Sequence, residues 1–122
     1  MAERSYFDLF TGRDDDAVSV SDGDTIFETG DPADCFYVVR RGAVELRNGD
    51  TVLEVVGPSG IFGEMALVDG GPRSASAIAA GDSELVRVDQ PRFEYLVQQT
   101  PYFAQEVMRV MAKRLRATTE RL

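Results

Sequence analysis

Short apolar segments, bounded by Gly, Pro or Asp, recur over most of the chain from Val18 to about Val88. Segments of this length and spacing favour strands, and their regular succession is typical of a sandwich or a jelly-roll barrel. We therefore expect a mainly β domain in which the strands occupy about residues 18–88. The predicted strands are Thr25–Glu28, Cys35–Arg40, Ala43–Arg47, Val52–Val56, Ala75–Ala79 and Glu84–Val88.

The dipeptide Asn48-Gly49 stands between two of these segments. A type I′ turn needs positive φ at both central residues, and Asn followed by Gly meets that need best. The sequence therefore predicts a two-residue hairpin at Asn48-Gly49.

The apolar period changes to a helical one after residue 90. A short helix is predicted at about 91–98, with Pro91 in its first turn and Asp89 as its N-cap. A second, longer helix is predicted at about 101–120, beginning at Thr100-Pro101. The segment SYFDLF near the N-terminus predicts one more short helix, with Phe7 and Phe10 facing inward.

The longer helix carries two apolar stripes. One consists of Met108, Met111, Leu115, Thr118 and Leu122, and the other of Phe103, Val107 and Val110. One stripe can pack on the barrel while the other meets a partner helix or closes over a pocket. A single broad side facing the core explains the same spacing equally well.

Composition excludes several classes of function. The chain of 122 residues, predicted to form one domain, has no histidine and a single cysteine. Ser–His and Cys–His catalysis, His-based metal sites and structural zinc are therefore excluded. Cys35 lies in an apolar run, which predicts a buried, inert thiol in a reducing compartment. We expect a cytoplasmic protein, because we find neither a signal peptide nor an apolar run of membrane-spanning length.

The net charge of −8 argues against nucleic acid as a partner, because such binding depends on neutralising phosphates. Basic residues do gather near the C-terminus, on the predicted long helix. We interpret them as the solvated face of that helix: Arg109, Lys113, Arg114, Arg116 and Arg121.

The candidate chemistry lies in FGEMALVDGGPRSASA, residues 62–77. A helical turn that starts near Gly63 offers unpaired N–H groups to an anion, and glycine lets a ligand come close to the backbone. The fork of Arg73 suits two phosphate oxygens, whereas the Glu64 carboxylate suits a sugar hydroxyl. A ribose phosphate satisfies both. The simpler alternative is that Glu64 and Arg73 pair with each other.

This run is similar to the phosphate-binding cassette of the cyclic nucleotide-binding domain family, in which FGE, a short apolar helix, a variable turn and Pro-Arg follow one another. The upstream run GDPADCFYVVRRGAVEL, Gly30–Leu46, resembles a second motif of that family. The resemblance covers about residues 18–115. It implies an eight-stranded β-roll with an N-terminal helix and C-terminal B and C helices.

The resemblance also implies the site. Glu64 would accept a hydrogen bond from the ribose 2′-OH, and Arg73 would pair with the cyclic phosphate. The predicted ligand-binding residues are Gly63, Glu64, Met65, Ala66, Arg73, Ser74, Ala75, Ser76, Val55 and Val56, with Met111 or Leu115 as a cap on the purine. No catalytic or metal-binding residue is predicted.

The implied function is that of a sensor domain, stand-alone or excised from a larger protein, without cofactor other than its ligand. Ser74 favours cAMP over cGMP, and the C-terminal helix offers a surface for a homodimer or an effector protein. No membrane contact is expected. The alternatives are a β-roll that binds proteins without nucleotide and a cupin-like enzyme, which the absence of histidine disfavours.

Overall fold

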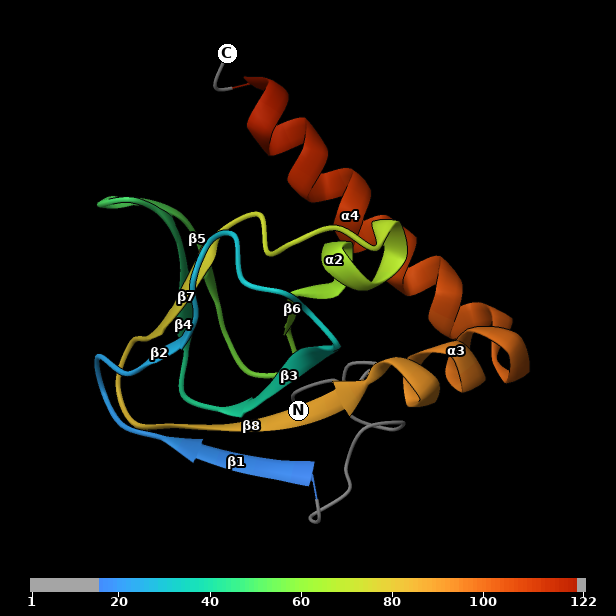
Figure 1. The fold of residues 1–122 in the computed structure, drawn as a ribbon, viewed down its shortest axis with the longest axis horizontal. Coiled ribbons are helices and arrows are strands. Elements are labelled where there is room, and N and C mark those ends of the chain that lie inside the picture. The colour runs from blue at the N-terminus through green and yellow to red at the C-terminus, as the bar shows by residue number, and fades with distance from the viewer. Residues whose placement is uncertain (1–15, 121–122) are drawn as a thin grey trace, which may run out of the picture.

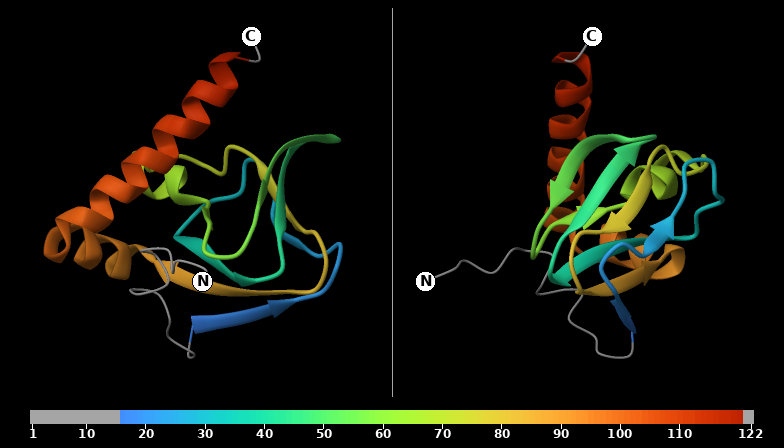
Figure 2. Two further views of the ribbon diagram at one scale, coloured as in Figure 1. Left: turned by 180° about the vertical axis from the view of Figure 1, so that it is seen from behind. Right: turned by 90° about the vertical axis from the view of Figure 1, so that its left-hand side faces the viewer.

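The computed structural model describes residues 16–120, with side chains described as far as residue 117. Within these residues, eight strands form two antiparallel four-stranded sheets, ordered β1-β8-β3-β6 and β2-β7-β4-β5 (Figures 1 and 2). The strands are β1 Ala17–Val20, β2 Thr25–Phe27, β3 Cys35–Arg41, β4 Val44–Asn48, β5 Thr51–Val56, β6 Ile61–Phe62, β7 Ser76–Ala79 and β8 Ser83–Asp89. The predicted mainly β roll is confirmed, whereas the helix predicted at Phe7 and Phe10 lies outside the described residues.

Two of the eight strands were not among the predicted segments. β6 has only two residues, which pair with Tyr37 and Val38 of β3. β1 is mostly exposed and pairs with β8 along one edge of its sheet. Neither strand shows the alternation of buried and exposed positions from which a strand is recognised in a sequence.

The sheet that contains β3 and β8 is buried on both faces. Phe36 and Val38 of β3 belong to one core cluster, whereas Val39 belongs to the other, because successive side chains of a strand point to opposite faces. The cluster outside the roll, beneath the helices, is Phe36, Val38, Ile61, Leu67, Val86, Val88, Phe93, Leu96, Phe103 and Val107. The cluster inside the roll is Phe27, Val39, Val44, Val56, Phe62, Ala77 and Leu85.

Three described helices accompany the strands: α2 Glu64–Asp69, α3 Gln90–Gln99 and α4 Pro101–Glu120. The Asp89 side chain accepts a hydrogen bond from the Arg92 amide, 2.9 Å away, so the predicted cap of α3 is confirmed. The rings of Phe93 and Phe103 pack edge to face, with centroids 6.0 Å apart, and this contact holds α3 against α4. The C-terminal end of α4 extends beyond the roll (Figure 2).

The apolar side chains of α4 have two environments, and Met111 of the first stripe shares the core environment of the second. Phe103 and Val107 are buried in the outer core cluster, and Val110 packs against it. Met108 and Leu115 are 59% and 66% exposed. A single broad side facing the core is therefore wrong for the described part of the helix, and a stripe that packs on the roll is confirmed. Thr118 and Leu122 lie outside the described side chains.

The β4–β5 hairpin forms where the sequence places it, but with another turn. Asn48 pairs with Thr51, so the linking residues are Gly49 and Asp50. Of these two only Gly49 has positive φ, at 61°. This is the requirement of a type II′ turn, which places glycine first, and the type I′ prediction is wrong. Within the described part of the chain, no helix is long and apolar enough to cross a membrane.

Candidate functional site

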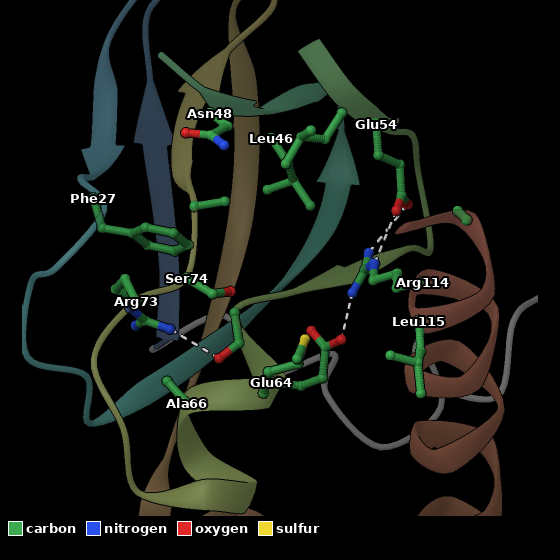
Figure 3. Close-up of a pocket in the computed structure, with 15 residues that line it drawn as sticks. Phe27, Leu46, Asn48, Glu54, Glu64, Ala66, Arg73, Ser74, Arg114 and Leu115 are labelled. Atoms are coloured by element: carbon green, nitrogen blue, oxygen red, sulfur yellow. Dashed lines mark hydrogen bonds and ion pairs between the residues drawn. The ribbon is translucent and has the colours of Figure 1, made fainter. Parts of the chain in front are cut away.

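A pocket of about 480 Å³ opens between the β2-β7-β4-β5 sheet, α2 and α4 (Figure 3). Its walls come from segments far apart in the sequence, since strand, cassette and C-terminal helix all contribute. The lining residues are Phe27, Leu46, Asn48, Leu53, Glu54, Gly63, Glu64, Met65, Ala66, Arg73, Ser74, Ala75, Arg114, Leu115 and Ala117.

Glycines in the left-handed conformation bound α2 at both ends. Gly63 is its N-cap, with φ 85°, and Gly70 its C-cap, with φ 72°. Residue 63 must also be small, because a Cβ there would lie 2.5 Å from the Arg73 Nη1. The sequence of the cassette thus permits close approach between the start of α2 and the Arg73 side chain.

Arg73 is buried, at 4% exposure, among neutral groups. Its Nη1 donates to the Gly63 carbonyl oxygen at 2.8 Å, and its Nη2 to the Cys35 carbonyl oxygen at 2.7 Å. The guanidinium also lies 4.1 Å above the centre of the Phe27 ring. Among the described residues it has no carboxylate partner, and its Nε has no hydrogen-bond partner at all. A buried charge held in this way is suited to an anion, because an unpaired buried charge is costly.

Glu64 is the most deeply buried carboxylate of the pocket, at 1% exposure. Its Oε1 lies 2.5 Å from the Nη1 of Arg114, which reaches over from α4. The simpler alternative, a Glu64–Arg73 pair, is therefore wrong. The two charged side chains of the cassette have separate partners, and Figure 3 shows Glu64 directed toward Arg114, while Arg73 lies near Phe27.

Arg114 was interpreted as part of a solvated face, and the structure corrects this. Its side chain is 16% exposed and donates from Nε and Nη2 to Glu54 of β5, at 2.9 and 3.2 Å. The Nη2 also donates to the Ile61 carbonyl oxygen. Burial works against the charged form, but the hydrogen bond to Glu54 and the charge of Glu64 outweigh it and raise the pKa of Arg114.

The other basic residues of α4 do face solvent where they are described. Lys113 and Arg116 are exposed, and Arg109, 64% exposed, pairs with Glu106 one turn away. Arg121 lies outside the described residues.

Most of the predicted site residues line the pocket. These are Gly63, Glu64, Met65, Ala66, Arg73, Ser74, Ala75 and, from the predicted cap, Leu115. Ser76 lies away from it, with its hydroxyl 3.0 Å from the Thr29 amide. Met111 packs against the outer core cluster instead of the pocket.

The apolar wall predicted at Val55 and Val56 is elsewhere. Val55 is 56% exposed, and Val56 belongs to the cluster inside the roll. Leu46 and Leu53 supply the wall instead. A register shift in the β4–β5 pair leaves Leu53 as an extra residue, because Leu46 faces Glu54 while Arg47 faces Val52. Such a bulge redirects side chains, so both Leu53 and Glu54 reach the pocket.

Sequence reasoning missed seven lining residues: Phe27, Leu46, Asn48, Leu53, Glu54, Arg114 and Ala117. None belongs to the contiguous cassette, and no local motif marks any of them as a residue of the pocket. Within residues 16–120 no group of three or more His, Cys, Asp or Glu is arranged to hold a metal ion.

The fold and the pocket define a β-roll with a buried arginine, held by neutral groups, beside a short helix. The chain belongs to the cyclic nucleotide-binding domain family, whose family model matches residues 17–100. It is 31% identical to a CRP-like cAMP-activated global transcriptional regulator of Mycobacterium tuberculosis, over 82% of this chain and 47% of the regulator. It is 36% identical to the cyclic AMP receptor protein of Thermus thermophilus, over 77% of this chain and 46% of that protein.

Solved structures agree with this assignment. The crystal structure of the Thermus thermophilus catabolite activator protein matches with a TM-score of 0.79 and 32% identity, covering 93% of this chain and 55% of that one. The cAMP-bound form of the EAL enzyme Bd1971 matches with a TM-score of 0.65 and 34% identity, covering 85% and 29%. Its cGMP-bound form gives 0.66 and 35%, with the same coverage. The chain spans about half the length of the curated relatives it matches.

Proposed function

We propose that this domain binds a cyclic nucleotide, with cAMP favoured over cGMP, and acts as a regulatory sensor and not as an enzyme. The observation that carries the proposal is Arg73, a buried guanidinium in the pocket wall with an unpartnered Nε and no carboxylate beside it among the described residues. A cyclic phosphate bears the single negative charge that this site lacks. The relatives named for cAMP support the same ligand.

Each part of the nucleotide has a counterpart in the pocket. The phosphate would meet Arg73, the Ser74 hydroxyl and the amide of Ala75. The 2′-OH of the ribose would donate to Glu64, which a deoxyribose cannot do. Leu46, Leu53 and Leu115 would form the apolar surfaces on which the purine rests.

The preference for cAMP rests on Ser74 and on the names of the relatives. The EAL enzyme that resembles this chain has been solved with cAMP and with cGMP, so a pocket of this class accepts either base. We therefore expect selectivity between the two to be a matter of degree.

Ligand binding would be passed on through α4. Arg114, Leu115 and Ala117 of this helix line the same pocket as the cassette, and Arg114 joins the two through Glu64. A ligand that orders the cassette would therefore also affect Glu64, the residue that Arg114 of α4 contacts. Such a switch needs two positions of α4 that bind the nucleotide with different affinity.

The exposed side of α4 is the surface we propose for output. Met108 and Leu115 are large apolar side chains left exposed one heptad apart, which suits a homodimer or the helix of an effector protein. The lone, buried Cys35 suits the cytoplasm. The second candidate function, a protein-binding β-roll without nucleotide, would use this same surface.

Thermal unfolding with cAMP, cGMP and 5′-AMP tests the proposal. A ligand at about 100 times its Kd stabilises the folded state by about 2.7 kcal/mol. We expect cAMP to raise Tm by about 10 °C, cGMP to raise it less, and 5′-AMP, whose phosphate is uncyclised and doubly charged, to leave it almost unchanged. If none of the three nucleotides raises Tm above that of the ligand-free domain, the protein-binding alternative is favoured.

A further inference from the structure

Glu54 is a pocket residue that no motif of the cassette includes. It lies on β5 beside the bulged Leu53, and its carboxylate is directed toward Arg114 of α4 (Figure 3). Both of its oxygens are engaged by Arg114, Oε1 with Nε at 2.9 Å and Oε2 with Nη2 at 3.2 Å. This two-pronged geometry fixes the plane of a guanidinium as well as its distance.

The Glu54 contact determines where the rest of Arg114 points. A guanidinium is planar and rigid, so fixing the edge that contains Nε and Nη2 also fixes the direction of Nη1. That nitrogen meets the Oε1 of Glu64 at 2.5 Å. Among the described residues the other oxygen of Glu64, Oε2, has no hydrogen-bond partner. Arg114 thus occupies one oxygen of Glu64 and leaves the other for a ligand.

We propose that Glu54 is a positioning residue for sugar recognition: by holding Arg114 from the strand side, it orients the Glu64 carboxylate toward the 2′-OH of a bound nucleotide. The proposal rests on the proposed function, because it needs a ribose in the pocket. Glu54 itself acts through Arg114 and is 40% exposed, whereas Glu64 is buried. The role therefore differs from that of a residue that contacts the sugar directly.

A simple charge effect is distinguishable from positioning. Glu54 places a negative charge beside the site of an anionic ligand, so its removal strengthens the binding of every cyclic nucleotide by a similar factor. The ratio of two affinities cancels this factor. The ratio of the Kd values for 2′-deoxy-cAMP and cAMP changes only when recognition of the 2′-OH changes.

Calorimetric titration of the full chain with cAMP and 2′-deoxy-cAMP provides the test, on the parent, Glu54→Gln, Arg114→Gln and the double variant. The matched control is Glu45→Gln, on the neighbouring strand β4, because Glu45 pairs with Arg47 and does not line the pocket. We expect the preference for cAMP to fall about fivefold in Glu54→Gln and to stay at the parent value in Glu45→Gln. In the Arg114→Gln background, Glu54→Gln should leave the ratio of the two Kd values unchanged, even if both affinities shift by the same factor.

The possible outcomes separate the two proposals. A parent chain that binds neither nucleotide overturns the proposed function and this inference with it. A parent that binds both nucleotides, together with an unchanged ratio in Glu54→Gln, overturns this inference alone. If Glu54→Gln lowers the preference for cAMP equally in the parent and in the Arg114→Gln background, Glu54 contacts the ligand directly. This result also contradicts a positioning role. If Arg114→Gln does not fold, the test rests on the ratio of the two Kd values in Glu54→Gln and Glu45→Gln. Equal ratios in these two variants would overturn the inference.

Discussion

Arg73 donates from Nη1 to the carbonyl oxygen of Gly63 at 2.8 Å, at a point where residue 63 has no room for a side chain. The contact joins the two ends of the cassette, because Gly63 precedes α2 and Arg73 follows it. It also leaves the guanidinium charge without a counter-charge among the described residues. Arg73 is therefore a buried cation surrounded by neutral groups, which is the basis for proposing an anion there.

Replacing Arg73 by alanine should weaken cAMP binding by about 100-fold or more, since removing one partner of a buried charge pair costs about 3–5 kcal/mol. The affinity of Arg73→Lys for cAMP should lie between those of the parent and Arg73→Ala, because lysine keeps the positive charge but lacks the two-pronged donor geometry of arginine. Titration calorimetry measures both. Arg116→Ala, which removes a positive charge from the exposed part of α4, serves as the control and should bind like the parent. Parent-like binding by Arg73→Ala would place the phosphate elsewhere.

Replacing Gly63 by alanine should also weaken cAMP binding, because the new Cβ would lie 2.5 Å from Arg73 Nη1 and displace the guanidinium. Gly23→Ala is the matched control. Gly23 has the same φ of 85°, but a Cβ there meets nothing within 4 Å. Both variants should lose similar stability from backbone strain, and Gly63→Ala alone should lose affinity. Equal affinities for the two variants would contradict the close approach.

Replacing Arg114 by alanine should lower the free energy of unfolding by about 3 kcal/mol or more, because Glu64 is then a buried carboxylate without its partner. Adding Glu64→Gln should restore part of the loss, since the unpaired charge is then gone. Urea unfolding measures each variant, with Lys113→Ala on the exposed side of α4 as control. Additive losses in the double variant would show that the pair is not coupled.

Alkaline stability should depend on Tyr37. Burial, with a hydrogen bond to Cys35, raises the pKa of Tyr37 from 10.0 to about 12. A pKa that is higher in the folded state gives stability that is complete below pH 10 and disappears as pH rises from 10 to about 12. Tyr37→Phe should lack this decline when the free energy of unfolding is measured across that range. Tyr95→Phe, at a tyrosine that is 56% exposed, should keep it.

The cassette was predictable because it is contiguous. Glycine at 63, a six-residue helix, a turn and Arg73 follow one another within one stretch, and the resemblance of this stretch to a known cassette identified seven residues that line the pocket. Six of the eight described strands and both C-terminal helices were predictable for a similar reason, since apolar period and caps are local signals. The role of each residue toward a nucleotide stays a prediction for the experiments above.

The predictions that the structure corrects concern residues whose positions depend on contacts between segments distant in sequence. Val55 and Val56 fit a strand pattern, but a bulge opposite Leu46 turns Leu53 and Glu54 into the pocket. A one-residue shift of this kind follows from how β4 meets β5, and neither segment shows it in isolation. Arg114 had the same local signature as its exposed neighbours on α4.

The sequence by itself determined the mainly β class through local periodicity, and the cassette and the family through one contiguous motif that resembles a known one. The tertiary structure alone decided how charges are paired. It brings Arg114 to Glu64, 50 positions away, and to Glu54, 60 positions away, while it leaves Arg73 among neutral groups. Pairing of charges depends on distance in space and on burial, and neither is encoded in the spacing of residues along the chain.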